Sequence, residues 1–84
     1  MKLYRGISKK VCESYKKKGI PKNSNFTNKL SGARNKGNCI IIIKRTKNFK
    51  PIKESNRTFN QLKISERYYN NINPIKRFKV REFK

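Results

Sequence analysis

Three short stretches of the chain combine cationic side chains with amide, hydroxyl or aromatic groups. They are residues 21–26, residues 34–38 continued by 44–47, and residues 67–69 together with 76–78. Lysine and arginine can neutralise phosphates, asparagine amides can hydrogen-bond a base edge, and aromatic rings can stack on an unpaired base. This combination is the chemistry of nucleic-acid binding.

We expect contacts with phosphate, sugar and bases to come from the cations, amides and hydroxyls of these stretches. The candidate RNA-binding residues are Lys22, Asn23, Ser24, Arg34, Asn35, Lys36, Lys44, Arg45, Lys47, Arg67, Lys76 and Arg77. A chain this rich in lysine also forms such clusters by composition alone, so a solvated face is the alternative for each of them.

The acidic and histidine content argues against catalysis. The chain has four acidic residues and no histidine, so neither a His-centred triad nor a His–carboxylate metal site can be built. The acids are Glu13, Glu54, Glu66 and Glu82, which are scattered in the sequence, although folding could bring two of them together. We predict that the protein is not an enzyme, with no metal, no cofactor and no small-molecule substrate.

The two cysteines, Cys12 and Cys39, lie far apart and form no Cys-x-x-Cys pair, so a zinc site is not expected. A nucleic-acid-binding chain normally occupies a reducing compartment. We therefore interpret them as two ordinary thiols, with Cys39 half-buried beside the isoleucine run. A disulfide is the alternative that the sequence leaves open.

Net charge and length set the class of partner. The 84 residues carry 24 Lys and Arg against 4 acids, a formal charge of +20. Such a chain repels itself when compact, and nucleic-acid phosphates are its natural counter-charge. An anionic membrane is the competing partner, but no apolar run is long enough to span a bilayer and no clean amphipathic face stands out. We expect no membrane insertion and no homo-oligomer.

The elements that must position these residues are few, because 84 residues form one small domain. Residues 8–19 predict a short helix, since Ser8 can cap its start and Gly19 can end it. Residues 20–38 have no hydrophobic period and are expected to form an extended irregular loop that becomes ordered on RNA.

Residues 39–84 are predicted to form a mini-domain with a basic tail. Four consecutive isoleucines, residues 40–43, predict a central strand. Apolar residues spaced by three and seven predict a second helix over residues 56–70. Residues 76–84 are expected to be a basic arm or a short strand. The predicted fold class is small α+β with extended irregular RNA-binding segments.

The order of the segments along the chain carries a further signal. Its residues are Ile20-Pro21-Lys22-Asn23-Ser24-Asn25, then Arg34-Asn35 with Cys39-Ile40, then Lys44-Arg45-Thr46-Lys47, then Phe59, Ile64, Ser65 and Arg67, and last Ile72-Asn73-Pro74-Ile75-Lys76-Arg77-Phe78. This collinear order resembles organellar (mitochondrial-type) small-subunit ribosomal protein 14. Two further families compete: residues 49–53 with 63–66 resemble small-subunit protein 19, and residues 45–47 with 74–82 resemble large-subunit protein 14.

The resemblance implies a structural constituent of the ribosome that binds rRNA in the head of a small subunit. Its partners would be rRNA and neighbouring ribosomal proteins. The excess of Lys, Asn and Ile, which have A/T-only codons, indicates an AT-rich genome and therefore a mitochondrion or another organelle. The alternatives are a large-subunit ribosomal protein and a free basic nucleic-acid-binding protein of the nucleoid or regulatory kind.

Overall fold

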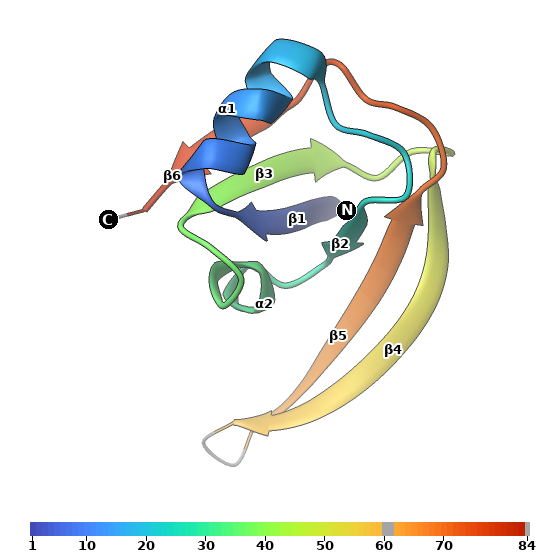
Figure 1. Cartoon of the computed structure of the whole chain (residues 1–84). Coiled ribbons are helices and arrows are strands. Elements are labelled where there is room, and N and C mark those ends of the chain that lie inside the picture. Colours follow the sequence, from blue (N-terminus) through green and yellow to red (C-terminus); the bar gives the residue numbers. More distant parts are fainter. Residues whose placement is uncertain (60–61, 84) are drawn as a thin grey trace.

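The computed structural model describes the backbone of residues 1–59 and 62–83 and the side chains of residues 1–54 and 65–83. One antiparallel sheet has the strand order β4-β5-β2-β1-β3-β6 (Figure 1). Its strands are β1 (Lys2–Ile7), β2 (Asn25–Thr27), β3 (Cys39–Lys44), β4 (Phe49–Phe59), β5 (Leu62–Asn71) and β6 (Lys79–Glu82). Helix α1 (Lys9–Lys18) follows β1, and helix α2 (Leu30–Arg34) follows β2. The predicted α+β class is confirmed.

Helix α1 forms where the sequence predicts it, because its two ends carry strong local signals. The Ser8 hydroxyl accepts a hydrogen bond of 3.3 Å from the Val11 N–H. Gly19 ends the helix with a positive φ of 84°, and its N–H donates to the Tyr15 carbonyl. The helix buries Cys12 and Tyr15 against the sheet.

The hydrophobic core lies on one face of the sheet, where α1 and the chain that follows β5 cover it (Figure 1). Its buried members are Leu3, Ile7, Cys12, Tyr15, Ile20, Phe26, Cys39, Ile41, Phe49, Tyr69 and Ile75. The four isoleucines form a strand, β3, as predicted, and it pairs with β1 over six residue pairs. The prediction that this strand is central is wrong, because only β6 lies between β3 and the edge of the sheet. None of the helices in the described residues is long and apolar enough to cross a membrane.

The prediction of an irregular loop over residues 20–38 is wrong in part, because β2 and α2 lie within it. Phe26 of β2 is buried and packs edge-on against Phe49, with 5.3 Å between ring centroids. Ala33 of α2 is buried on the other face of the sheet, against Gly6 of β1. Tertiary burial of these two apolar side chains organises a segment that shows no period of its own.

The predicted helix over residues 56–70 is also wrong. Residues up to Phe59 belong to β4 and those from Leu62 belong to β5, which pair as a long antiparallel hairpin. Residues 60–61 lie outside the described residues. Asparagine, threonine and tyrosine favour a helix only weakly, and pairing of β5 with both β4 and β2 decides in favour of a strand. At the C-terminal end the strand alternative is confirmed as β6, and Lys84 lies outside the described residues.

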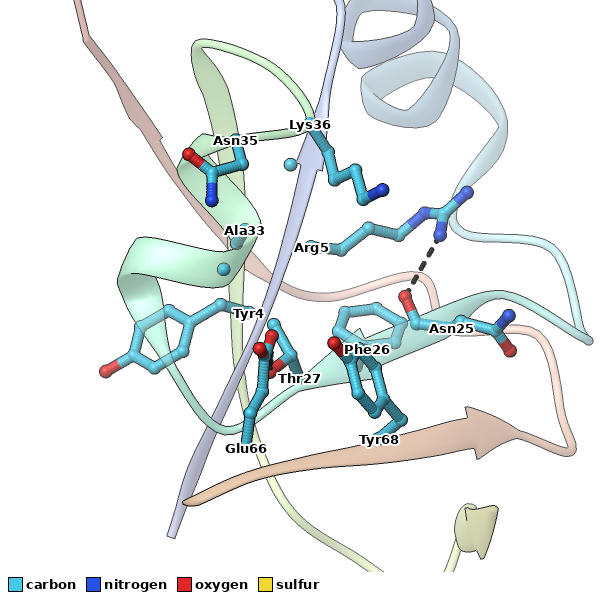
Figure 2. A pocket seen from close by; sticks show the side chains of 12 residues that line it. Tyr4, Arg5, Asn25, Phe26, Thr27, Ala33, Asn35, Lys36, Glu66 and Tyr68 are labelled. Atoms are coloured by element: carbon cyan, nitrogen blue, oxygen red, sulfur yellow. Dashed lines mark hydrogen bonds between the residues drawn. The ribbon is translucent and has the colours of Figure 1, made fainter. Parts of the chain in front are cut away.

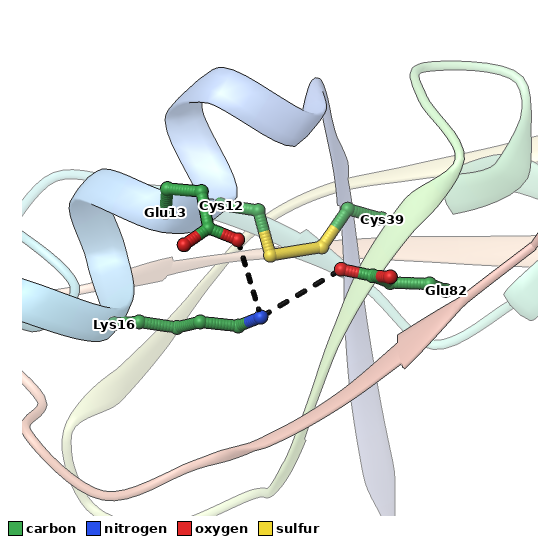
Figure 3. A network of polar contacts seen from close by, with 5 residues as sticks. All are labelled: Cys12, Glu13, Lys16, Cys39 and Glu82. Carbon is green, nitrogen blue, oxygen red and sulfur yellow. Dashed lines mark hydrogen bonds and ion pairs between the residues drawn. A yellow bond between two sulfur atoms is a disulfide. The ribbon is translucent and has the colours of Figure 1, made fainter.

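The interpretation of the cysteines as two free thiols is wrong. Cys12 of α1 and Cys39 of β3 form a disulfide, with 6.4 Å between their Cα atoms (Figure 3). Helix α1 crosses the start of β3, so residues 27 positions apart meet in the core. Cys39 is buried, with 3 % of its surface exposed. Beside the disulfide, Lys16 lies within 3.4 Å of Glu13 and 3.6 Å of Glu82.

Candidate functional site

The sheet opens between its two central strands. β1 pairs with β2 through a single residue pair, Tyr4 with Thr27, whereas it pairs with β3 along its full length. Arg5 bridges the opening: its Nη1 donates to the Asn25 carbonyl at 3.0 Å and its Nε donates to the Tyr15 hydroxyl at 3.2 Å. Because the strands are not paired here, side chains from both faces of the sheet can reach one cavity.

That cavity, which we call the split-sheet pocket, has a volume of about 430 Å³. Its walls come from β1, β2, α2, the turn after α2, and β5 (Figure 2). The lining residues are Tyr4, Arg5, Gly6, Asn25, Phe26, Thr27, Gly32, Ala33, Asn35, Lys36, Glu66 and Tyr68. Small residues on β1 and α2 let backbone form part of the wall, while ionic and aromatic side chains extend into the space.

Glu66 supplies the one carboxylate among the described residues that line this pocket. It lies on β5 with 3 % of its surface exposed, and its Oε1 accepts a hydrogen bond of 2.9 Å from the Thr27 hydroxyl. The Thr27 oxygen also accepts from the Lys29 N–H at 3.2 Å, so its proton is directed at the carboxylate. Helix α2 lies directly against the same group, because a Cβ at Gly32 would overlap Glu66 Oε1.

Cationic and aromatic groups complete the pocket. The half-buried Arg5 side chain extends across it, and Lys36 reaches in from the turn after α2 (Figure 2). The Tyr68 ring lies between Glu66 and Asn25 in the same view, with Lys53 Nζ 5.9 Å from its centroid. The pocket therefore offers positive charge for an anion, an aromatic surface for a flat ring, and an oriented carboxylate.

A second cavity, of about 800 Å³, adjoins the first, and we call it the basic cavity. It is lined by Ser8, Lys9, Arg34, Asn35, Lys36, Gly37, Asn38, Cys39, Glu82 and Phe83. Asn35 and Lys36 line both cavities. Three exposed residues predicted from the sequence are thus neighbours here: Arg34 lines the basic cavity, and Asn35 and Lys36 lie between the two cavities.

Two of the predicted cations, one at the end of β3 and one before β6, come together on another part of the surface. Lys44 and Arg77 line a third cavity with Lys79 and Phe78. Arg45 lies over the ring of Tyr69 at 4.7 Å from its centroid. The other two predicted cations of these segments, Lys47 and Lys76, are exposed.

The first predicted segment divides between surface and core. Lys22 and Asn23 are exposed in the turn after α1, where Asn23 has a positive φ of 70°. Ser24 is buried, and its hydroxyl donates to the Pro21 carbonyl at 2.8 Å. Its side chain therefore holds this turn together.

Arg67 is exposed on β5, 3.6 Å from Glu54. Of the twelve predicted residues, Ser24 is buried and the other eleven occupy several sites on the surface that do not converge on one.

One group of potential metal ligands occurs among the described residues. The two sulfurs of Cys12 and Cys39 and a carboxylate oxygen of Glu82 lie within 4.8 Å of one another. The two sulfurs are bonded to each other and Glu82 forms an ion pair with Lys16, so these three residues form a disulfide beside an ion pair and not a metal site.

Of the residues that line the split-sheet pocket, sequence reasoning predicted Asn35 and Lys36 but missed Arg5 and Glu66. Two signals were present. Arg5 lies between the apolar residues Leu3 and Ile7, and Glu66 is one of only four acids opposing 24 cations. Neither signal connects the two residues, because β5 reaches β1 only through β2.

Comparison of the chain with protein families, with curated proteins and with solved structures finds no match. The function must therefore be argued from the site.

Proposed function

We propose that the split-sheet pocket binds NAD and transfers its ADP-ribosyl group. The observation that carries the proposal is Glu66, a buried carboxylate oriented by Thr27 in a cavity that also contains the Arg5 guanidinium. Pockets of about 300–1,000 Å³ with a few convergent polar groups are the usual small-molecule sites of proteins. The volume and the composition of this pocket agree with that pattern.

The anionic part of the ligand belongs with Arg5 and Lys36. Arg5 is held by Tyr15 and Asn25, contacts that use two of its five N–H groups. The remaining N–H groups of a planar guanidinium match two phosphate oxygens at once, and the charge of Lys36 adds to the attraction. A diphosphate satisfies both residues.

The flat part of the ligand belongs with Tyr68 and Glu66. An aromatic ring binds a planar group through its face, and a carboxylate attracts a cation. The nicotinamide ring of NAD is both planar and cationic, so one group meets both demands. Glu66 and Arg5 then orient the dinucleotide with its ribose between them.

The reaction follows from the acid–base groups that line the pocket. Glu66 is the one acidic residue among the described lining residues, and its carboxylate stabilises developing positive charge, which favours a leaving group that departs without taking up a proton. Nicotinamide does so, because it leaves as a neutral molecule that takes the electron pair of the C1′–N bond. Positive charge develops on the ribose, and the Glu66 carboxylate stabilises it.

The test is release of nicotinamide from NAD by the purified chain and by Glu66→Gln. The glutamine carbonyl can still accept the Thr27 proton, so the fold is retained while the charge is lost. Two unit charges 4 Å apart interact by about 4 kcal/mol at an effective dielectric constant of 20, which corresponds to roughly a thousand-fold loss of rate.

Glu54→Gln is the matched control. Glu54 is exposed on β4, outside the pocket, and its carboxylate accepts from the Ser65 hydroxyl. This variant should retain the rate. Absence of nicotinamide release by the unaltered chain, or equal rates for Glu66→Gln and the unaltered chain, would contradict the proposal.

A second candidate function is the one expected from the sequence, a structural rRNA-binding protein of an organellar ribosome. The observation that favours it is the charge of +20, with predicted cations exposed after α1, after α2, after β3 and before β6. On this proposal Lys and Arg neutralise closely packed phosphates on several sides of the domain. The absence of catalysis and of a small-molecule substrate, and the organellar location, stay predictions attached to this candidate.

Co-sedimentation tests this second candidate. A ribosomal protein is expected to migrate with one subunit through a high-salt sucrose gradient. Recovery of the whole chain from the top of the gradient would contradict it.

A further inference from the structure

The basic cavity has a composition that the proposed reaction at Glu66 does not use. Exposed Lys9 and Arg34 line this cavity and not the split-sheet pocket, and Lys36 lines both. Glu82 is the one acid among its described lining residues, and it is paired with Lys16 at 3.6 Å. The cavity therefore carries an excess of positive charge and should attract an anion.

Two guanidinium groups are positioned at the edge of this cavity by one aromatic ring. Arg34 lies over the ring of Phe83 with its Cζ 4.0 Å from the centroid, and Arg81 lies over the same ring at 4.8 Å. Stacking on a ring leaves the N–H edges of a guanidinium able to donate to phosphate. Phe83 thereby positions two phosphate-binding groups through contacts with one ring.

The basic cavity and the split-sheet pocket are neighbours. The turn that carries Asn35 and Lys36 separates them, and both residues line both cavities. Gly37 presses this turn against β1, since a Cβ there would overlap the Ile7 carbonyl. A ligand lying in the basic cavity is therefore next to Lys36, which also lines the pocket that contains Glu66.

We infer that the basic cavity binds a single-stranded nucleic acid and that the phosphate at the end of this strand is the acceptor of the ADP-ribosyl group. This inference rests on the proposed function of the split-sheet pocket. A phosphodiester strand supplies one anion per nucleotide for Lys9, Arg34 and Lys36. It also fits a chain of charge +20 better than a neutral acceptor does.

The transfer balances without a general base. An anionic oxygen of the terminal phosphate donates an electron pair to C1′ of the ribose and forms the new C–O bond. The C1′–N bond breaks, and nicotinamide leaves with its electron pair as a neutral molecule. No proton moves and nothing is oxidised or reduced, which suits a pocket whose one lining carboxylate stabilises positive charge.

Binding is tested with single-stranded RNA and DNA oligonucleotides whose affinity is measured against salt concentration. The variant is Lys9→Gln with Arg34→Gln, and the control is Lys18→Gln with Lys50→Gln, which removes the same charge from exposed residues that lie outside both cavities and outside the predicted RNA-binding set. For single strands the slope of log affinity against log salt is about −0.7 per phosphate neutralised. The slope of the cavity variant is expected to be less steep by about 1.4, since two phosphate contacts are lost, and the slope of the control is expected to equal that of the unaltered chain.

Transfer is tested by incubating the unaltered chain with NAD and oligonucleotides ending in phosphate or in hydroxyl. Attachment of ADP-ribose to the phosphate end of RNA or DNA, lost in the cavity variant, supports the inference. Nicotinamide release with no modified phosphate end, modification of the hydroxyl-ended strand alone, or equal salt slopes for variant and control would overturn it while leaving the proposed function standing. Absence of nicotinamide release under every condition overturns both. An acidic peptide that binds the cavity in place of the strand also counts against the inference.

Discussion

Reduction of the Cys12–Cys39 disulfide is expected to destabilise the domain strongly. The cross-link spans 27 residues, which include β2 and α2 and so most of the wall of the split-sheet pocket. The chain-entropy relation for a loop of this length gives about 3.5 kcal/mol at 25 °C, or roughly 400-fold in the folding equilibrium constant. An 84-residue domain has a free energy of unfolding on the order of 4–12 kcal/mol, so this is a large part of the total.

The assay is urea unfolding followed by far-ultraviolet circular dichroism, with the same protein oxidised and reduced. A urea m-value of about 1 kcal/mol/M predicts a midpoint that falls by about 3.5 M on reduction. The double variant Cys12→Ala with Cys39→Ala serves as the control. It should unfold at one midpoint whether or not a reductant is present.

A loss of less than 1 kcal/mol on reduction would refute the reasoning. It would mean that burial of Cys12 and Cys39 among core residues holds α1 on β3 without the covalent bond. The reduced protein would then keep the pocket wall in place.

Three further outcomes are expected. Asn71→Ala should lower the free energy of unfolding by about 3 kcal/mol in urea titrations, because the fully buried amide accepts from the Ser24 N–H and donates to two carbonyls; a loss below 1 kcal/mol would contradict this. Gly6→Ala should cost about 1–3 kcal/mol in the same titration, since the new Cβ overlaps the Ala33 carbonyl and must displace α2; unchanged stability would show that α2 moves freely. Arg5→Lys should slow nicotinamide release at least about tenfold while the free energy of unfolding changes by less than about 1 kcal/mol. Lysine keeps the positive charge but lacks the planar guanidinium that can bind two phosphate oxygens at once. An unchanged rate would show that Arg5 does not contact NAD.

Elements defined by neighbouring residues could be predicted from the sequence. Ser8 and Gly19 mark the ends of α1 through contacts within four residues, and the isoleucines of β3 suit only a buried strand or core. The hairpin of β4 and β5 could not be predicted in this way. Its pairing depends on residues up to 22 positions apart, such as Phe49 with Asn71. The apolar residues within it are spaced by three and seven, which is also the spacing of a helix.

The site was harder to predict than the fold. The predicted RNA-binding residues were chosen because cations cluster in the sequence, and the structure separates them over several surfaces, with Ser24 buried. Arg5 and Glu66 carry no sequence link, since they meet only because β2 lies between β1 and β5 and pairs with β1 at one position. A pocket made by an incomplete strand pairing leaves no periodic trace in the sequence.

The most direct test of the central claim is a titration of the isotopically labelled chain with NAD, followed by backbone amide resonances. The account predicts that the amides of Arg5, Thr27 and Glu66 shift together and saturate, while those of Ile43 and Arg77 at the third cavity do not. The Glu66→Gln variant should bind NAD with lower affinity, with shifts at the same amides. No shift at millimolar NAD, or shifts centred away from Arg5 and Glu66, would contradict the account.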